Sequence, residues 1–217
     1  MALSKLKYKS LNVTPAANKG IGFDSGADDL STDFAGGAIT FIKKLTASSS
    51  ATLDFVDGTS SVVLDDTYKE YLFTFKNIHP ATDDQPLTFQ ANAAGGSGYD
   101  ETMTTTYFRA YHVESGGSPA VGYDGNRDLA QSTSFQQVIS DIGNENDECG
   151  SGYLHLFNPS STTFVKHFIC ESTTTTTSAV VQYIAGYFNT TSAIDEIQFK
   201  MASGNIDAGD ICLYGIN

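Results

Sequence analysis

The sequence predicts an all-β fold: a single antiparallel β-sandwich, jelly-roll-like, with about ten strands and one short helix. Aromatic residues make up 12% of the chain and charged residues only 17%, while Thr and Ser are abundant, and strands favour this composition. Apolar and polar residues alternate over short segments that Gly-, Asp- and Ser-rich turns separate. Helices and strands do not alternate along the chain, so a parallel α/β sheet is not expected.

Residues 1–37 are expected to form an arm followed by a loop. The stretch "NKGIGFDSGADDLSTDFAGG" is dense in Gly, Asp and Ser and shows little periodicity. Strand-like segments begin at "AITFIKKLT" and continue to the end without a break in composition. The predicted division is therefore an arm over 1–37 and one sandwich domain over 38–217.

The predicted strands show the two-residue period of a half-buried sheet. In "YKEYLFTFKNI", for example, Tyr71, Phe73 and Phe75 share one face, and in "QPLTFQAN" Leu87 and Phe89 do. The other strand-like segments are "ATLDFV", "TMTTTYFRAYHV", "GYLHLFNP", "TFVKHFICES", "AVVQYIAGYF", "AIDEIQFKM" and "GDICLYGI".

The segment "DLAQSTSFQQVISDIGN" is the one predicted helix. Ser132 or Thr133 could cap it, and the glycine after Ile142 could end it. Phe135, Val138 and Ile142 would then lie on one apolar stripe.

The last 21 residues, "IQFKMASGNIDAGDICLYGIN", are interpreted as strand, turn and strand. The first strand alternates apolar and polar residues, whereas the second is apolar on both faces. Ile211 and Leu213 occupy one face and Cys212, Tyr214 and Ile216 the other. Both faces of this strand are therefore expected to be covered.

The net charge is −13, and its distribution is uneven. The first four basic residues precede the first acidic one, so the remainder carries 8 basic residues against 25 acidic ones. A basic arm on an acidic body predicts that the arm docks on an acidic partner, such as a neighbouring copy, although a solvated terminus is the alternative. The acidic body argues against nucleic-acid binding. The docking residues would be Lys5, Lys7, Lys9 and Lys19.

Targeting and redox features are sparse. Three scattered cysteines predict no disulfide framework and fit synthesis in a reducing compartment. The sequence has no apolar run long enough for a signal peptide or a membrane span, so no membrane insertion is expected.

No catalytic motif stands out, and neither a cofactor nor a metal is predicted. His155 and His167 lie on consecutive predicted strands, but two histidines without a third ligand are weak support for zinc. Asp124, Asn126 and Asp128 alternate as in a calcium loop, yet the required glycine and final glutamate are missing. A non-enzymatic protein is therefore expected, with paired carboxylates of a carbohydrate-active enzyme as an alternative.

Two Gly-rich loops each place a tyrosine beside an aspartate. They are "GGSGYD", with Tyr99 and Asp100, and "VGYDGNRD", with Tyr123 and Asp124. An aromatic face stacks on sugar C–H groups and a carboxylate accepts from hydroxyls, so these loops are candidates for binding a host surface glycan or receptor.

Three segments together resemble virion structural proteins of tailed phages, particularly cyanophages. They are "YKEYLFTFKNIHPATDD", "LHLFNPSSTTFVKHFI" and "IAGYFNTTSAIDEIQFKMASGNIDAGDICLYGI". The resemblance extends from about Lys69 to the end and includes the opening "MALSKLKYKSLNVTPA". The matching positions include Gly186, Tyr187, Ser203, Gly204, Ile206, Gly209, Leu213, Tyr214 and Gly215.

The resemblance implies a particle component, assembled in the host cytoplasm and contacting other virion proteins. It leaves the location open between a tail fibre, adaptor or receptor-binding role and a capsid decoration or cement role. Such proteins work as rings, trimers or lattices, so a homo-oligomer is expected, with a trimer favoured. Its interface would use the second apolar face of the last strand, at Cys212, Tyr214 and Ile216, unless a central position in the sheet covers that face.

Overall fold

The computed structural model describes residues 22–23, 30–31, 38–117 and 119–217. The chain divides into two units, Met1–Ala38 and Ile39–Asn217. In the first unit, β1 (Gly22–Phe23) pairs antiparallel with β2 (Leu30–Ser31). No helix in the described part of the chain is long and apolar enough to cross a membrane.

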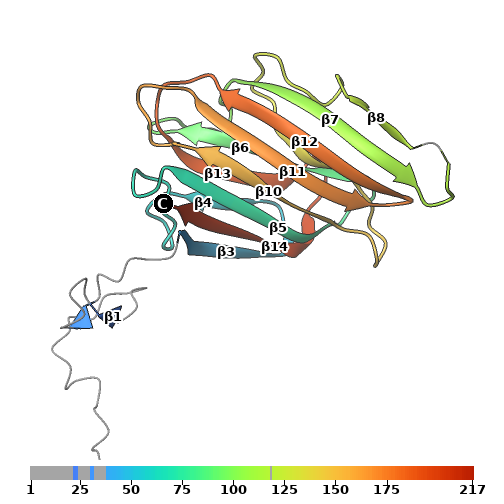
Figure 1. Cartoon of the computed structure of the whole chain (residues 1–217), viewed down its shortest axis with the longest axis horizontal. Helices are drawn as coiled ribbons and strands as arrows, with labels where there is room; N and C mark the ends of the chain where they lie inside the picture. The colour runs from blue at the N-terminus through green and yellow to red at the C-terminus, as the bar shows by residue number, and fades with distance from the viewer. Residues whose placement is uncertain (1–21, 24–29, 32–37, 118) are drawn as a thin grey trace, which may run out of the picture. The chain divides into compact units, whose positions relative to one another are not determined.

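The second unit is a sandwich of two antiparallel sheets, which confirms the predicted fold class (Figure 1). The large sheet has the order β3-β14-β5-β10-β11-β12-β7-β8, and the small sheet has the order β4-β13-β6-β9. The strands are β3 (Ile39–Ser50), β4 (Leu53–Val56), β5 (Glu70–Pro80), β6 (Gln85–Ala93), β7 (Met103–Val113), β8 (Ala120–Tyr123), β9 (Gln136–Ile142), β10 (Gly150–Phe157), β11 (Lys166–Thr175), β12 (Ser178–Phe188), β13 (Ile194–Met201) and β14 (Ile206–Ile216).

Eight of these strands have the connectivity of a jelly roll. The first of them pairs with the last, β3 with β14, and the pairs β4–β13, β5–β10 and β6–β9 follow inward along the chain. These pairs alternate between the two sheets, as when one long folded ribbon wraps into a sandwich.

The remaining four strands are two insertions into the jelly roll. β7 and β8 lie in sequence between β6 and β9, and β11 and β12 lie between β10 and β13. β11 pairs with β10, β12 with β11, and β7 with β12, so the insertions widen the large sheet on one side only. We call these four strands the inserted half and the other eight the jelly-roll half.

The core lies between the two sheets and is strongly aromatic. Phe199 of β13 is fully buried, and its ring lies 5.4 Å from those of Phe73 and Phe75 and 6.1 to 6.2 Å from those of Phe55 and Phe89. Two of these four pairs, those with Phe55 and Phe75, are edge-to-face, an arrangement that aromatic quadrupoles favour. The predicted inward face of β5 is confirmed, since its aromatic side chains are at most 3% exposed.

The predicted helix within residues 128–144 is wrong. Residues Gln136–Ile142 form strand β9 at the edge of the small sheet, and the described chain contains no helix. Val138 and Ile142 are buried as expected, but the neighbouring Ile139 and Ser140 are buried too, so both faces of this strand are covered. The helical spacing of Phe135, Val138 and Ile142 arose by chance in a short apolar run. Over so few residues, periodicity alone cannot distinguish a helix from a buried strand.

The last two strands do not form a hairpin with each other. β13 lies in the small sheet and β14 in the large one, so the turn between them carries the chain across the sandwich. β14 lies between β3 and β5, with Ile211 and Leu213 fully buried on its inner face.

Candidate functional site

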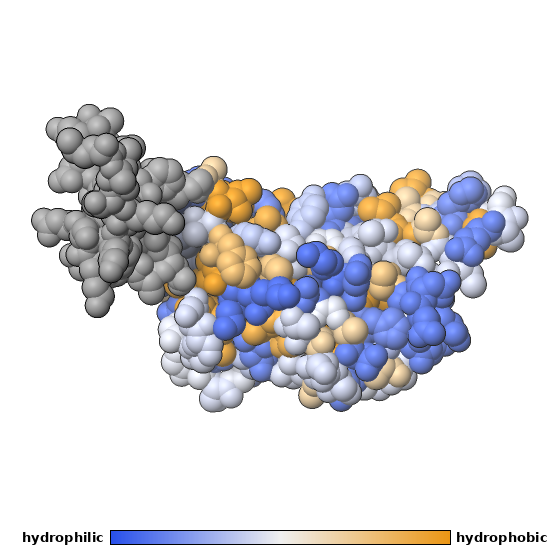
Figure 2. Space-filling model, turned by 90° about the horizontal axis from the view of Figure 1, so that it is seen from below, coloured by the Kyte–Doolittle hydropathy of each residue, from blue (hydrophilic) through white to orange (hydrophobic). Residues whose placement is uncertain are grey.

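The outer face of the large sheet, the side turned away from the small sheet, is unusually rich in exposed aromatic and aliphatic side chains. Buried and exposed residues alternate along β10, β11, β12 and β7, so one face fills the core and the other meets solvent. Figure 2 shows hydrophobic patches at the surface, separated by hydrophilic residues. The exposed large side chains of this face are Ile39, Phe41, Phe108, Val121, Tyr123, Tyr153, Ile169 and Tyr183.

Strand register places five of the side chains on this face in one line across the sheet. Tyr153 pairs with Glu171, Glu171 with Tyr183, Tyr183 with Phe108, and Phe108 with Tyr123. We call this line, which crosses β10, β11, β12, β7 and β8, the aromatic row. Four of its five members are aromatic, and Glu171 is its only charged residue.

A stacked pair forms the centre of the aromatic row. The ring centroids of Phe108 and Tyr183 are 5.0 Å apart and their planes differ by 17°. Nearly parallel rings this close must overlap face to face, because two rings lying side by side need more room. The rings therefore stand on the sheet, and the second face of Tyr183 is turned towards β11 and Glu171.

Glu171 is held in place by its neighbour in the row. The hydroxyl of Tyr153 donates a hydrogen bond of 2.7 Å to Oε2 of Glu171. This bond to the carboxylate, together with partial burial, raises the pKa of Tyr153. The phenol therefore stays protonated at neutral pH and keeps the carboxylate oriented beside Tyr183.

A hollow flanks the aromatic row on each side. One, of about 440 Å³, lies over the small residues Ala185 and Gly186 and is bordered by His167, Ile169 and Tyr187. The other has a volume of about 520 Å³, and its lining includes Ala110, Val121, Thr173 and Val181, which lie next to the row on its other side.

At the opposite end of the outer face lie the predicted interface residues. Tyr214 pairs with Phe41, their rings 5.6 Å apart, and Ile216 pairs with Ile39. Phe41 and Ile39 are 57% and 56% exposed, whereas Cys212 of β14 is buried within this chain. The central position of β14 thus covers part of its second face, and the apolar edge on β3 remains exposed.

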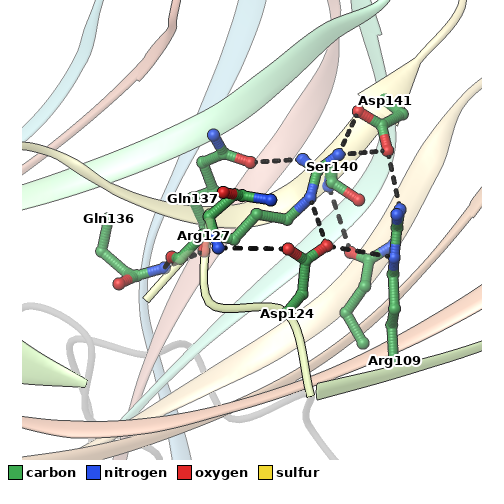
Figure 3. A network of polar contacts seen from close by, with 9 residues as sticks. Arg109, Asp124, Arg127, Gln136, Gln137, Ser140 and Asp141 are labelled. Carbon is green, nitrogen blue, oxygen red and sulfur yellow. Dashed lines mark hydrogen bonds and ion pairs between the residues drawn. The ribbon is translucent and has the colours of Figure 1, made fainter. Parts of the chain in front are cut away.

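A second polar feature, an Arg–Asp cluster, pins the inserted half to the small sheet (Figure 3). Asp141 of β9 accepts hydrogen bonds from Arg127 at 2.7 and 2.9 Å and from Arg109 of β7 at 3.0 Å. Asp124, directly after β8, accepts one from Arg127 at 3.0 Å and forms an ion pair with Arg109 at 3.3 Å. Partial burial opposes the charge on Arg127, but Asp141 and Asp124 outweigh it and raise the pKa of its guanidinium.

This Arg–Asp cluster is a structural clamp. Its two positive and two negative charges balance, and both carboxylates are engaged by guanidinium groups. Each carboxylate is therefore held between two guanidinium groups, and the cluster joins β7 and β9 to the residues that follow β8.

Next to the clamp, part of the interior of the inserted half is polar. Thr105 donates to Gln136 at 2.6 Å, and Ser172 donates to Gln182 at 2.8 Å, all four side chains being buried. Several other buried polar atoms have no hydrogen-bond partner among the described residues. They include the hydroxyls of Tyr107, Ser140 and Thr174 and Nε2 of Gln182.

The two predicted Tyr–Asp loops are not brought together. Tyr99 lies by Glu196 of β13, in the small sheet, and burial raises the pKa of its phenol well above the usual range, with a hydrogen bond to Glu196 adding to the effect. Tyr123 is 60% exposed at the end of β8, in the large sheet, and its hydroxyl donates to Asp128. Asp124 belongs to the Arg–Asp cluster. The two loops therefore do not form one site, glycan binding by Tyr99 and Asp100 or by Tyr123 and Asp124 stays a prediction, and only Tyr123 lies on the aromatic row.

The other predicted residues have mixed outcomes. Lys5, Lys7, Lys9 and Lys19 lie outside the described residues. The three cysteines are free thiols, with Cys170 and Cys212 buried. The part of the chain that the structure describes contains no group of three or more potential metal ligands.

Sequence reasoning missed most of the aromatic row. Its members come from four different predicted strands and from one loop, and only their register shows that they are neighbours. A usable signal was present, because "FVKHFI" and "VVQYIAGYF" carry apolar residues on both faces, as the last strand does.

Comparison of the chain with protein-family models, with curated proteins and with solved structures gives no match.

Proposed function

We propose that this protein is a non-enzymatic structural component of a tailed-phage particle, docked by residues 1–37 and presenting its sandwich in a tail-fibre, adaptor or receptor-binding role. The exposed aromatic outer face carries this proposal. Monomeric proteins rarely leave large apolar patches in water, and such patches usually mark a surface that binds something. A rigid sandwich with one chemically distinctive face suits recognition and display.

The residues of the phage resemblance have structural roles that support the proposal. Gly209 has φ +118°, and a Cβ there would lie 2.6 Å from the carbonyl oxygen of Asn77 in β5. A Cβ on Gly215 would overlap the ring of Tyr68, and Gly204 has φ +73° in the turn between the sheets. These glycines therefore specify how β14 enters the large sheet, so the shared pattern is that of a scaffold rather than of a reaction centre.

The exposed edge of β3 favours a second candidate, a capsid decoration or cement protein. Among the residues that the structure describes, β3 has a partner strand on only one side, and it carries the exposed Ile39 and Phe41. An unpaired strand with apolar side chains is suited to contact with a neighbouring copy, as in a trimer or lattice.

Immunogold electron microscopy tests the proposal. An antibody raised against residues 38–217 is applied to purified particles of a phage that carries this gene, and the same phage with the gene deleted is the control. Labelling at the tail supports the first role, and labelling over the head supports decoration. Particles without label in a lysate that contains the protein would show that it is not a virion component.

A separate pair of variants tests whether the arm docks the protein on the particle. A chain lacking residues 1–37 should fold and remain in the soluble fraction of the lysate but be missing from the particles. Replacing Lys5, Lys7, Lys9 and Lys19 by Gln should reduce incorporation, because the positive charge of the arm is removed. Unchanged incorporation of both variants would contradict docking through the arm.

A further inference from the structure

The aromatic row places the exposed ring of Tyr183 beside the carboxylate of Glu171. Tyr183 stands on β12 with one ring face against Phe108 and the other turned towards β11. Glu171 on β11 lies between Tyr183 and Tyr153 of β10, whose hydroxyl is bound to that carboxylate. Since neighbouring strands are about 4.8 Å apart, the two tyrosines arise from backbones about 10 Å apart.

This geometry combines two kinds of contact. The ring face of Tyr183 can pack on C–H groups, while the carboxylate of Glu171 accepts hydrogen bonds from hydroxyl groups. The hollow over Ala185 lies directly beside the row along the strands and is bordered by His167 and Tyr187. A ligand with one apolar face and several hydroxyls at its edge satisfies both contacts.

Charge repulsion rules out the anionic classes of ligand. The protein carries a net charge of −13, and Glu171 is the only charged side chain in the row. A nucleic acid or an anionic lipid surface would be repelled. A second copy related by a two-fold axis through the row would bring two Glu171 carboxylates together and bury them, at a high desolvation cost. A neutral ligand meets none of these penalties.

We infer that the aromatic row binds a neutral glycan, with a sugar ring packed on Tyr183 and its hydroxyls bonded to Glu171. This inference rests on the proposed recognition role and names its ligand. It also moves the glycan site from the Tyr–Asp loops to the outer face of the large sheet.

Affinity electrophoresis of the full chain tests this site. Native gels contain dextran, laminarin or galactomannan as neutral probes, and heparin or alginate as charged ones, and an array of neutral bacterial glycans extends the set. The protein should be retarded or bound by at least one neutral probe and by neither charged one. Binding should persist when salt is raised, because no charge on the ligand is involved. The absence of binding to every neutral probe would overturn the inference.

Matched variants locate the site. Tyr183→Ala should weaken binding about tenfold, because the stacking contact is lost. Tyr183→Phe keeps the ring and should bind nearly as well, and Phe164→Ala, which removes a ring 69% exposed in a loop outside the row, should bind like the wild type. Glu171→Ala should weaken binding more than Glu171→Gln, since the amide still offers an acceptor. Equal binding by wild type and Tyr183→Ala would exclude this site.

Three further outcomes separate the alternatives. If sedimentation shows a dimer that Tyr183→Ala converts to a monomer, the face is an interface between copies and the glycan assignment is wrong. If particles carry the protein while neutral glycans do not bind, the proposed function stands and the ligand inference fails. If glycans bind but particles lack the protein, the virion role fails and the site remains.

Discussion

The two halves of the large sheet are continuous in hydrogen bonding but differ in what lies beneath them. Under the jelly-roll half, Phe73 and Phe75 pack on Phe55 and Phe199 in a dry aromatic core. Under the inserted half, the apolar core continues through Phe168, Ile184 and Phe188, but buried hydroxyls, amides and the Arg–Asp cluster accompany it. The same sheet is thus supported mainly by apolar packing on one side, and by apolar packing together with directional polar bonds on the other.

The two halves differ because the small sheet does not extend under the whole of the large sheet. The small sheet has four strands against eight, so the inserted half is covered mainly by its edge strand β9 and the residues leading into it. A partly covered sheet face cannot exclude water as a full sheet does, and polar side chains there cost less to bury. We expect the jelly-roll half to supply most of the stability, while the inserted half supplies four of the five residues of the aromatic row.

Phe199→Ala should have the largest effect of any single change considered. It removes a fully buried ring that contacts four others, so the free energy of unfolding should fall by about 3–5 kcal/mol. Denaturant unfolding followed by circular dichroism measures this loss. Phe164→Ala, at an exposed ring, should change it by less than about 0.5 kcal/mol. Similar losses at the two positions would contradict an apolar origin of the stability.

Arg127→Met should have an intermediate effect, confined to the inserted half and to the strand β9 that it contacts. It leaves Asp141 and Asp124 with Arg109 alone, and the partly exposed cluster should lose about 1–3 kcal/mol, less than a fully buried one. Hydrogen exchange should speed up in β7, β8 and β9 but not in β5 or β14. Adding Asp141→Asn should restore part of the loss, because the excess charge is removed. Uniform acceleration across both halves would contradict the division.

Lys166→Met should leave stability unchanged or raise it by about 1 kcal/mol. Lys166 is fully buried in β11 and donates to the carbonyl oxygen of Thr190 at 3.2 Å. Burying a charge without a close carboxylate is costly, so an apolar side chain of similar length is tolerated. A loss above about 2 kcal/mol would show that the ammonium is needed.

The same residue gives a pH test. Burial lowers the pKa of Lys166, with Glu101 partly opposing this, so the unfolded chain binds the proton more tightly than the folded one. The folding penalty is present below the lowered pKa and disappears as pH rises towards the ordinary value of about 10.5. The stability difference between wild type and Lys166→Met should therefore shrink with rising pH in alkaline solution. Taking the difference cancels the opposing titration of buried tyrosines.

Thr174→Val should have the smallest effect, in the opposite direction from most core changes. The buried hydroxyl of Thr174 has no partner among the described residues, so replacing it with a methyl group of the same shape should be neutral or stabilise by up to about 1 kcal/mol. Ser172→Ala, by contrast, breaks bonds to Val138 and Gln182 and should cost about 1 kcal/mol. Destabilisation by Thr174→Val would reveal a bound water molecule at that hydroxyl.

Local patterns in the sequence predicted the fold class but not the pairing. Alternation placed Tyr71 and Phe73 correctly, because the period of two is a property of one strand. The alternation rule failed for residues 136–142, because side chains are buried on both faces of that strand and no two-residue period is left in the sequence. The turn chemistry around Gly204 and Gly209 is also the same whether the chain forms a hairpin or crosses between sheets.

The candidate site was still harder to predict. The aromatic row depends on the registers of four strand pairs, and a shift of one residue in any of them would turn the side chains to the other face. Tyr123 was singled out for its composition, and its place beside Phe108 comes from the pairing of β7 with β8. Tyr99 has the same local sequence character and lies by the small sheet.

The pairing of Ile39 with Ile216 has a mechanical consequence. The ends of the sandwich unit are adjacent on neighbouring antiparallel strands, about 5 Å apart. Tension applied between these two ends would open β3 from β14 like a zipper, breaking one ladder bond at a time, whereas tension through a single end and the outer face would load many bonds at once. A molecule tethered at one corner and gripping its target with the broad face would therefore be pulled in its stronger direction.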